Sequence, residues 1–169
     1  MAKDALGREW QLSTIQIDFI QPARLGVEYI GEDGQPHTPV LIHRAVTGST
    51  ERFMGVMIEH FAGAFPAWLA PVQAMIIPIS DEKHGAYGRE LKARFEAAGL
   101  RVEIDESKDR MQAKIRRAQL QKVPYMLIIG GKEQEAGAVA VRLRNGEDLG
   151  AMPVADFVER ARADIAAKI

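Results

Sequence analysis

The sequence predicts an α/β fold in two parts: a C-terminal mixed β-sheet with flanking helices, preceded by an antiparallel β plus helix fragment. Two observations carry this prediction. Beyond Pro71, continuous apolar runs such as VQAMIIPI (72–79) alternate with amphipathic segments, the pattern of strands covered on both faces by helices. Residues 8–46 instead alternate with a period of two, which is typical of antiparallel strands. With 47% hydrophobic and 27% charged residues, the chain has the composition of a folded protein.

The first part is predicted to contain one half-buried strand and one hairpin. Ile15 and Ile17 alternate with polar residues, so one side of that strand is expected to face a core. Residues 26–46 are predicted to form a hairpin, with the turn at 32–34 and a return strand over 40–46.

A helix is predicted to follow from Ser49 to Phe61. Phe53, Val56 and Met57 fall at helical spacing, and Ser49 or Thr50 can cap the first turn. The change from period two to period 3.6 therefore occurs near residue 48.

A junction between two domains is predicted at residues 61–71. Gly63, Pro66 and Pro71 interrupt the periodicity, although the Phe and Trp residues there favour a packed joint over a loose linker. We therefore expect domains at 1–70 and 71–169. The first has few elements from which to build a core, so we expect it to be a piece of something larger.

The second domain is predicted to be a βαβ arrangement followed by a hairpin and a closing helix. A hairpin is expected around Asn145-Gly146, because that dipeptide favours the required turn. The predicted elements are strands at 72–79, 101–105 and 124–131, helices at 88–99, 107–122 and 153–169, and the hairpin at 138–150.

Charge and cysteine content limit the functional classes. The formal net charge is −1, so binding to a nucleic acid must come from a local basic face. The chain has no cysteine, which excludes a disulfide framework and a thiolate nucleophile; zinc held by this chain alone would need His and carboxylate ligands. No apolar stretch is long enough to cross a membrane and the N-terminus does not resemble a signal peptide, so we expect a cytoplasmic protein without a membrane partner.

The segment HRAVTGSTERF (43–53) carries the clearest chemical pattern. A strand runs into Gly48, and a helix then begins with Arg52 in its first turn. A glycine allows close backbone approach, a helix N-terminus favours negative charge, and a guanidinium offers a fork of donors, so the pattern suits a phosphate or nucleotide. Spacing alone leaves open the simpler interpretation that Arg52 is a solvated surface residue.

This segment and its surroundings resemble one family. The run PVLIHRAVTGSTERFMGVMIEHFAGAFPAWLAPVQ resembles the third class II motif of threonyl-tRNA synthetases and the join to their anticodon-binding domain. GREWQLSTIQIDF upstream and KIRRAQLQKVPYMLIIGGKE and VAVRLRNGEDLG downstream match the same family in the same order. The resemblance covers nearly the whole chain, and it separates this family from the prolyl, histidyl and glycyl relatives.

The resemblance implies roles for residues of the first domain. His43 matches the family's histidine zinc ligand, and Arg52 matches the arginine that lies against the phosphates of ATP, which is used with Mg²⁺. His37, His60 and His84 have no such match and are expected to be structural or surface residues. The residues matching the amino-acid and adenosine pocket are Gln11, Thr14, Gln16, Gly48 and Ser49.

The second domain is expected to bind RNA. Basic residues are concentrated in the predicted helix at 107–122, and Arg142 and Arg144 leave one face of a strand, although such faces are usually only solvated. Ser107-Lys108 departs from the family pattern, so base readout is not assigned there. The resemblance implies base contacts at Glu133 and Arg142, with Lys132, Lys114 and Arg116 nearby.

The chain is expected to act as part of a threonyl-tRNA synthetase that activates threonine with ATP and charges tRNA(Thr) as a homodimer. The first two class II motifs, the zinc-binding cysteine and second histidine, and the editing domain would lie upstream, so the fragment alone is expected to be inactive. A stand-alone, non-catalytic tRNA-binding module is the alternative. A nucleotide-binding βαβ domain is weaker, since GGKE (130–133) lacks the spacing of a P-loop or a dinucleotide fingerprint.

Overall fold

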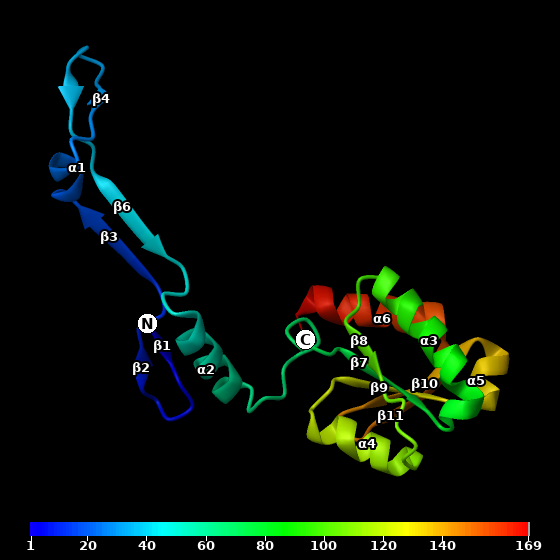
Figure 1. Ribbon diagram of the computed structural model, residues 1–169. Coiled ribbons are helices and arrows are strands. Elements are labelled where there is room, and N and C mark those ends of the chain that lie inside the picture. The colour runs from blue at the N-terminus through cyan, green and yellow to red at the C-terminus, as the bar shows by residue number, and fades with distance from the viewer. Residues whose placement is uncertain (169) are drawn as a thin grey trace. The chain divides into compact units, whose positions relative to one another are not determined.

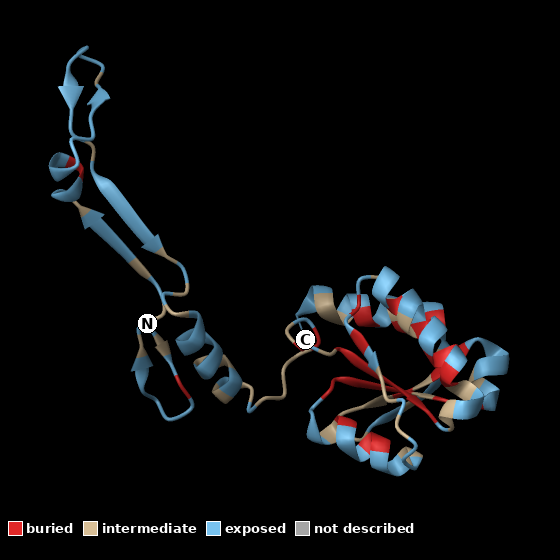
Figure 2. Ribbon diagram, in the orientation of Figure 1, coloured by how far each residue is buried: buried red, intermediate tan, exposed pale blue. Residues whose placement is uncertain are grey.

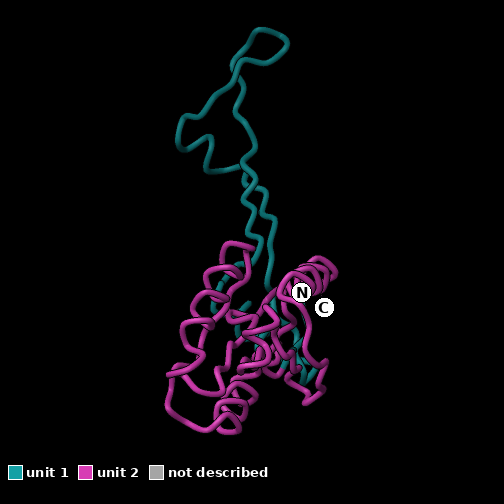
Figure 3. Tube along the Cα trace, turned by 90° about the vertical axis from the view of Figure 1, so that its right-hand side faces the viewer, with its two compact units in different colours: residues 1–61 teal, residues 62–169 magenta. Residues whose placement is uncertain are grey.

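The computed structural model describes residues 1–168, which divide into two compact units. The first unit comprises Met1–Phe61, and the second runs from Ala62 onward (Figure 3). Within the described residues, no helix is long and apolar enough to cross a bilayer.

The first unit consists of three two-stranded antiparallel ribbons and two helices (Figure 1). β1 pairs with β2, β3 with β6, and β4 with β5. The elements are β1 (Ala2–Lys3), β2 (Glu9–Trp10), β3 (Thr14–Asp18), α1 (Gln21–Arg24), β4 (Tyr29–Ile30), β5 (Pro36–His37), β6 (Leu41–Ala45) and α2 (Thr50–His60).

The predicted hairpin at 26–46 is only partly right. Its turn does lie at 32–34, where Gly34 has a positive φ of 73° and joins β4 to β5. The strand predicted at 40–46, however, pairs with β3, because Ile42 lies opposite Ile17 and continues that longer ribbon. Strand register over such a distance is a tertiary property that turn chemistry does not specify.

The expectation that β3 is half-buried is wrong for this chain. Ile15 is 64% and Ile17 is 59% exposed, because a two-stranded ribbon has no second layer of described residues to cover it (Figure 2). The helix predicted from Ser49 is confirmed. The Ser49 hydroxyl oxygen accepts a hydrogen bond from the backbone N–H of Arg52 at 3.2 Å and so caps α2.

The second unit is a five-stranded mixed sheet with helices on both faces, as predicted (Figure 1). The strand order is β11-β10-β9-β7-β8; β7 is parallel to β8 and β9, and β10 is antiparallel to β9 and β11. The elements are β7 (Ala74–Pro78), α3 (Asp81–Ala97), β8 (Val102–Ile104), α4 (Met111–Leu120), β9 (Tyr125–Ile129), α5 (Gly131–Ala136), β10 (Ala138–Leu143), β11 (Asp148–Pro153) and α6 (Val154–Ala167).

Two apolar cores lie on the two faces of this sheet. The larger core contains Phe95 of α3 and Phe157 of α6, whose rings meet edge to face at 5.3 Å. The smaller core joins Ile77 of β7 and Met126 of β9 to Ile115 of α4. Figure 2 shows the buried residues concentrated in the central strands and on the inner sides of the helices. The continuous burial of β7 explains its unbroken apolar run.

Two helices begin at residues other than those predicted. α3 begins at Asp81 and not at residue 88. Gly85 and Gly88 weaken the helical pattern in the sequence, so the predicted start is too late. In the structure both glycines lie within the helix and are buried in close packing. A Cβ on Gly88 would lie 2.6 Å from Cδ1 of Ile104, so glycine lets α3 approach β8. α4 begins at Met111 and not at residue 107.

Polar contacts hold residues 107–110 out of α4. The Asp105 carboxylate accepts from the backbone N–H of Ser107 at 3.0 Å, and Arg117 donates to Ser107 Oγ at 3.0 Å and to Asp109 Oδ2 at 2.8 Å.

The hairpin around Asn145-Gly146 is confirmed, with Gly146 at φ 95°. The short helix α5 is an element that the sequence analysis does not predict.

Residues 62–71 belong to the second unit, so the division falls earlier than the expected boundary after residue 70. Ala67 and Ala70 are buried, and the Gln73 amide donates to the carbonyl oxygen of Ala67 at 2.8 Å. Arg101 donates to the carbonyl oxygens of Trp68 and Ala70 at 2.9 to 3.0 Å. These hydrogen bonds replace secondary structure in satisfying the backbone of the joint.

We predict that Arg101→Ala lowers the free energy of unfolding of the second unit by about 1–3 kcal/mol, because charge-assisted hydrogen bonds to two carbonyl groups are lost. Urea denaturation followed by circular dichroism measures this. Arg94→Ala is the control, since Arg94 is an exposed residue of α3 whose ion pair with Glu90 is long, at 4.0 Å. Equal stability of the two variants would contradict the anchoring role of Arg101.

Candidate functional site

In the first unit, two predicted pocket residues, Thr14 and Gln16, share one face of the β3–β6 ribbon with His43, whereas Gln11 precedes β3. Gln16 lies directly opposite His43, and Thr14 lies opposite Ala45. Because residues two apart on a strand point to the same side, Thr14, Gln16 and His43 lie on one face. Gln16 and His43 are exposed and Thr14 is half-buried, so this face is open to a ligand.

Gly48 is required by the backbone. Its φ is +64°, and a Cβ at this position would lie 2.8 Å from the carbonyl oxygen of Leu12. Any other residue would be strained and would push these two segments apart. Gly48 therefore lets the loop before α2 lie against the residues that precede β3.

Arg52 lies against those same residues. Its Nη1 donates to the carbonyl oxygen of Gln11 at 3.2 Å, and its Cζ lies 5.9 Å from the centroid of the Trp10 ring. The guanidinium is exposed, and the Gln11 contact uses one of its five N–H donors. Gln11 and Arg52 are predicted site residues, whereas Trp10 is not, because its only sequence signal is its place beside Gln11.

The Ser49 hydroxyl is hydrogen-bonded to two residues in the first turn of α2. It accepts from the N–H of Arg52 and donates to Oε2 of Glu51 at 2.8 Å. Hydrogen bonds from the backbone of Glu51 and from this hydroxyl lower the pKa of the Glu51 carboxyl. Contact between Ser49 and a nucleotide would have to replace the bond to Glu51.

His43 alone does not make a zinc site. Its Nε2 lies 3.5 Å from Oδ2 of Asp18, whose other oxygen accepts from the N–H groups of Ile20 and Gln21. Those two bonds, chiefly, lower the pKa of Asp18. A protein zinc site needs at least three protein ligands, and residues 1–168 contain no cluster of three His or carboxylate side chains. The donor set of this chain therefore does not fit zinc by itself.

The other three histidines have ordinary contacts. His37 Nε2 meets Asp33 at 2.9 Å, the His60 ring packs edge to face on Phe61, and His84 Nδ1 meets the Gln134 amide at 3.0 Å.

In the second unit, Arg142 lies on the α4 side of the sheet. It is paired with Met126, a residue of the smaller core, and its Nε donates to the carbonyl oxygen of Gly146 at 3.4 Å. A register shift between Val141 and Arg142 occurs at this point in the hairpin. Arg142 is half-buried, which restricts its side chain while leaving donors accessible.

Glu133 and Lys132 lie in the first turn of α5. Oε2 of Glu133 accepts from the backbone N–H of Gly130 at 2.9 Å, so one carboxylate oxygen closes the start of the helix. Lys132 is exposed beside it. Glu133 thus has a structural task, and its second oxygen remains as an acceptor.

Lys114 does not belong to an exposed basic surface, which corrects the expectation. It is 1% exposed, and its Nζ donates to the carbonyl oxygens of Pro78 at 3.2 Å and Asp105 at 3.0 Å. The ammonium group thereby ties the end of β7 to the segment after β8. Arg116, by contrast, points to solvent, and the described residues offer it no ion pair.

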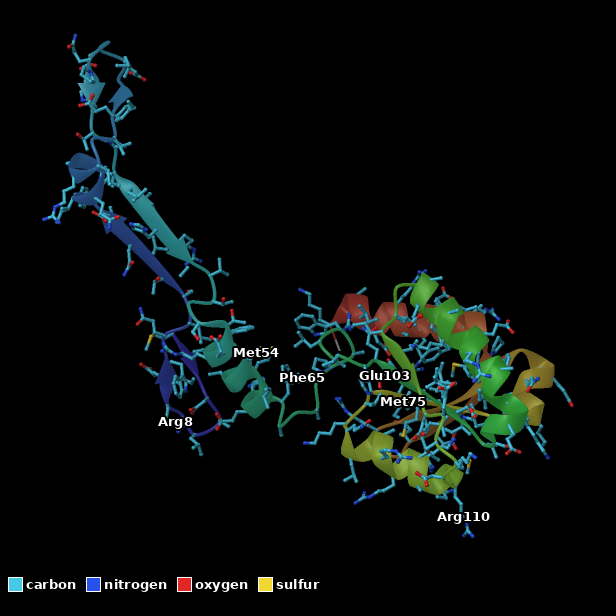
Figure 4. The ribbon with its side chains drawn as sticks, viewed as in Figure 1. Arg8, Met54, Phe65, Met75, Glu103 and Arg110 are labelled. Atoms are coloured by element: carbon cyan, nitrogen blue, oxygen red, sulfur yellow. The ribbon has the colours of Figure 1, made fainter. Side chains whose placement is uncertain are left out.

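A cavity of about 300 Å³ opens near the ends of β7 and β8. The sequence does not reveal it, because its walls come from two segments that are distant in the chain, each a loop that follows a parallel strand together with the start of the next helix. Oδ1 of Asp81 is buried without a hydrogen-bond partner, and the side chain of Arg110 extends outward at the start of α4 (Figure 4). The lining residues are Ile79, Ser80, Asp81, Glu82, Ser107, Lys108, Asp109, Arg110 and Lys114.

Both parts of the chain match models of known protein families. Residues 73–164 match the model of the anticodon binding domain. The chain belongs to the anticodon-binding domain family. Residues 1–61 match a second model, the tRNA synthetase class II core domain (G, H, P, S and T). The anticodon-binding fold predicted for the second part is therefore confirmed.

The curated relatives that this chain matches are threonine–tRNA ligases. That of Rubrobacter xylanophilus is 59% identical over 169 residues, which is 99% of this chain and 26% of the ligase. That of Thermus thermophilus is 56% identical over 161 residues, or 95% of this chain and 24% of the ligase. The chain thus spans about a quarter of the length of these relatives, and the resemblance to threonyl-tRNA synthetases is confirmed.

Solved structures of aminoacyl-tRNA synthetases also match this chain. The RNA binding domain of threonyl-tRNA synthetase from Cryptosporidium parvum Iowa II matches with a TM-score of 0.85 and 34% identity, over 95% of this chain and 41% of that one. Prolyl-tRNA synthetase from Cryptosporidium parvum matches with a TM-score of 0.67 and 24% identity, over 93% of this chain and 34% of that one, which shows the fold alone.

We predict that Lys114→Met lowers the free energy of unfolding by about 1–3 kcal/mol, because the buried carbonyl oxygen of Pro78 and the partly buried one of Asp105 lose their donor. Arg116→Met, two positions along the same helix, should change it by less than about 0.5 kcal/mol. Chemical denaturation of both variants measures the difference. If Lys114→Met is as stable as the wild type, the structural role of this lysine is refuted.

Proposed function

We propose that this chain works as part of a threonyl-tRNA synthetase, which activates threonine with ATP and charges tRNA(Thr). One observation carries the proposal: residues 1–61 match the class II core and residues 73–164 match the anticodon-binding domain, in one chain that is 54–59% identical to threonine–tRNA ligases. The chain would supply the third class II motif and the anticodon-binding domain. As part of such an enzyme it would act in the cytoplasm, within a homodimer, without a membrane partner.

The proposed anticodon contact centres on Arg142. Its half-buried guanidinium is held at the hairpin by the Gly146 carbonyl, so its free donors have a restricted direction, which suits reading an unstacked base. Glu133 has one free carboxylate oxygen to accept from a base. Lys132 and Arg116, both exposed, would contact phosphates. Lys114 would support the surface from beneath and not touch RNA.

In the first unit, Arg52 would bind the phosphates of ATP. Its charge would stabilise the negative charge that shifts to pyrophosphate as the adenylate forms. Gln11, Thr14 and Gln16 would line the pocket for threonine and the adenylate, while Gly48 and Ser49 would border the adenosine.

Mg²⁺ would accompany ATP as substrate. His43 would become a zinc ligand only together with residues from other parts of the enzyme, since this chain lacks the remaining donors within residues 1–168.

We predict that Arg142→Ala weakens binding of tRNA(Thr) by about 1–3 kcal/mol and reduces discrimination against tRNAs with other anticodons. Fluorescence anisotropy with cognate and anticodon-substituted tRNA measures both. The control is Arg160→Ala on α6, since α6 packs on the opposite face of the sheet. Equal weakening for every tRNA would instead identify a phosphate contact.

We predict that the isolated chain shows no threonine-dependent pyrophosphate exchange above background. A chimaera in which it replaces the matching segment of the Rubrobacter xylanophilus ligase should show exchange and charge tRNA(Thr). The same ligase lacking the segment is the negative control.

A stand-alone tRNA-binding module would give a different result: the chain would bind tRNA, but the chimaera would not charge it. Exchange by the isolated chain would contradict the proposal that its catalytic residues need partners elsewhere.

A further inference from the structure

The β1–β2 ribbon of the first unit encloses a buried carboxylate. Asp4 accepts from the indole Nε1 of Trp10 at 2.8 Å, from Nε of Arg8 at 2.5 Å, and from the backbone N–H groups of Leu6 at 3.0 Å and Arg8 at 2.8 Å. Burial alone would raise the pKa of Asp4, but the bonds from Trp10, Arg8 and the backbone outweigh it and lower the pKa to about 2. The carboxylate is therefore charged at neutral pH and fixes the indole.

The indole in turn supports two arginines. The Cζ atoms of Arg8 and Arg52 lie 5.7 and 5.9 Å from the centroid of the Trp10 ring, within the range of a cation–π contact. The next residue, Gln11, holds the same Arg52 guanidinium through its carbonyl oxygen at 3.2 Å. Arg52 is thus held by two consecutive residues of the chain.

The two arginines differ in how their charge is used. Arg8 is paired with the carboxylates of Asp4 at 2.5 Å and Glu59 at 3.7 Å. Arg52 has no ion pair among the described residues and contacts only a carbonyl and an aromatic face. Neutral partners hold a guanidinium in place without cancelling its charge, so Arg52 keeps that charge for an anionic ligand.

We propose that Trp10 is a positioning residue for Arg52, orienting its guanidinium toward the phosphates of ATP, and that Asp4 fixes the Trp10 ring for this purpose. This inference rests on the proposed function, because it assigns Arg52 an ATP contact. An arginine has many rotamers, and a ring face together with a carbonyl removes most of them before the ligand arrives. Phosphate binding then gains from pre-organisation rather than from a new contact.

Kinetics in the chimaera test the proposal. Trp10→Leu should lower kcat/KM for ATP in threonine-dependent pyrophosphate exchange by about 3- to 30-fold, with the KM for threonine unchanged. Trp10→Phe keeps a ring face and should stay within about 3-fold of the wild type.

Two further variants complete the design. Asp4→Asn, which keeps the ring but removes the charge, should give an intermediate loss and replaces Trp10→Leu if that variant does not fold. Trp68→Leu is the matched control, since the other tryptophan also lies under a cation, Lys168 at 5.9 Å, but in the second unit; it should leave kcat/KM for ATP unchanged.

A second readout does not depend on catalysis. In the isolated chain, the Nε–H resonance of Arg52 should lose its ring-current shift in Trp10→Leu and retain most of it in Trp10→Phe. An unchanged Arg52 resonance in Trp10→Leu, or a wild-type kcat/KM for ATP in that variant of an active chimaera, overturns the proposal. If the unsubstituted chimaera has no threonine-dependent exchange, the proposed function fails, and the resonance alone decides whether Trp10 orients Arg52.

Discussion

Burial of the parallel strand β7 on both faces is the constraint on which the second unit depends. Ile76 enters the larger core with α3 and α6, while Met75 and Ile77 enter the smaller core with α4. A strand covered in this way needs helices on both sides, and crossover connections between parallel strands supply them. The cavity lined by Ser80 and Arg110 opens beyond the ends of β7 and β8, where the chain leaves these strands and enters α3 and α4. The same constraint explains Lys114, whose ammonium donates to the carbonyl oxygen of Pro78 at the end of that buried strand and to that of Asp105 after β8.

Arginine held by backbone carbonyl groups recurs in both units, with different consequences. In the second unit, Arg101 and Arg144 donate to carbonyl oxygens of the joint at 65–70, so their charge is used to hold irregular backbone against the domain. In the first unit, Arg52 makes a similar contact with Gln11, but the remaining donors stay exposed. The difference lies in the surroundings of these arginines. Arg101 and Arg144 lie on a folded domain, whereas Arg52 lies at an open surface of the first unit.

The distribution of apolar burial also separates the units. In the first unit, Ile15, Ile17 and Ile42 are each about 60% exposed, and Asp4 and Pro22 are its only buried residues in the described part of the chain. Order there comes from polar contacts around Asp4 and Trp10 and from strand pairing, which are weaker and more local than a core. In the second unit, the two cores support the sheet that carries Arg142, and Glu133 lies in α5, the helix between β9 and β10.

Local patterns in the sequence determined much of this protein. The cap at Ser49, the Asn145-Gly146 turn and the unbroken apolar runs of β7 and β9 are decided by neighbouring residues, and the motif around Arg52 was sufficient to identify the family. Only the tertiary structure decided that β6 pairs with β3, that Lys114 is buried while Arg116 is exposed, and that Trp10 supports Arg52. Each of these depends on residues that are distant in sequence or on the depth of a face in the fold. Charge and periodicity in the sequence show neither the distant partners of a residue nor how deeply it is buried. For this reason the sequence places Lys114, which lies in a basic helix, at the RNA-binding surface, although its ammonium is buried and bound to backbone carbonyl oxygens.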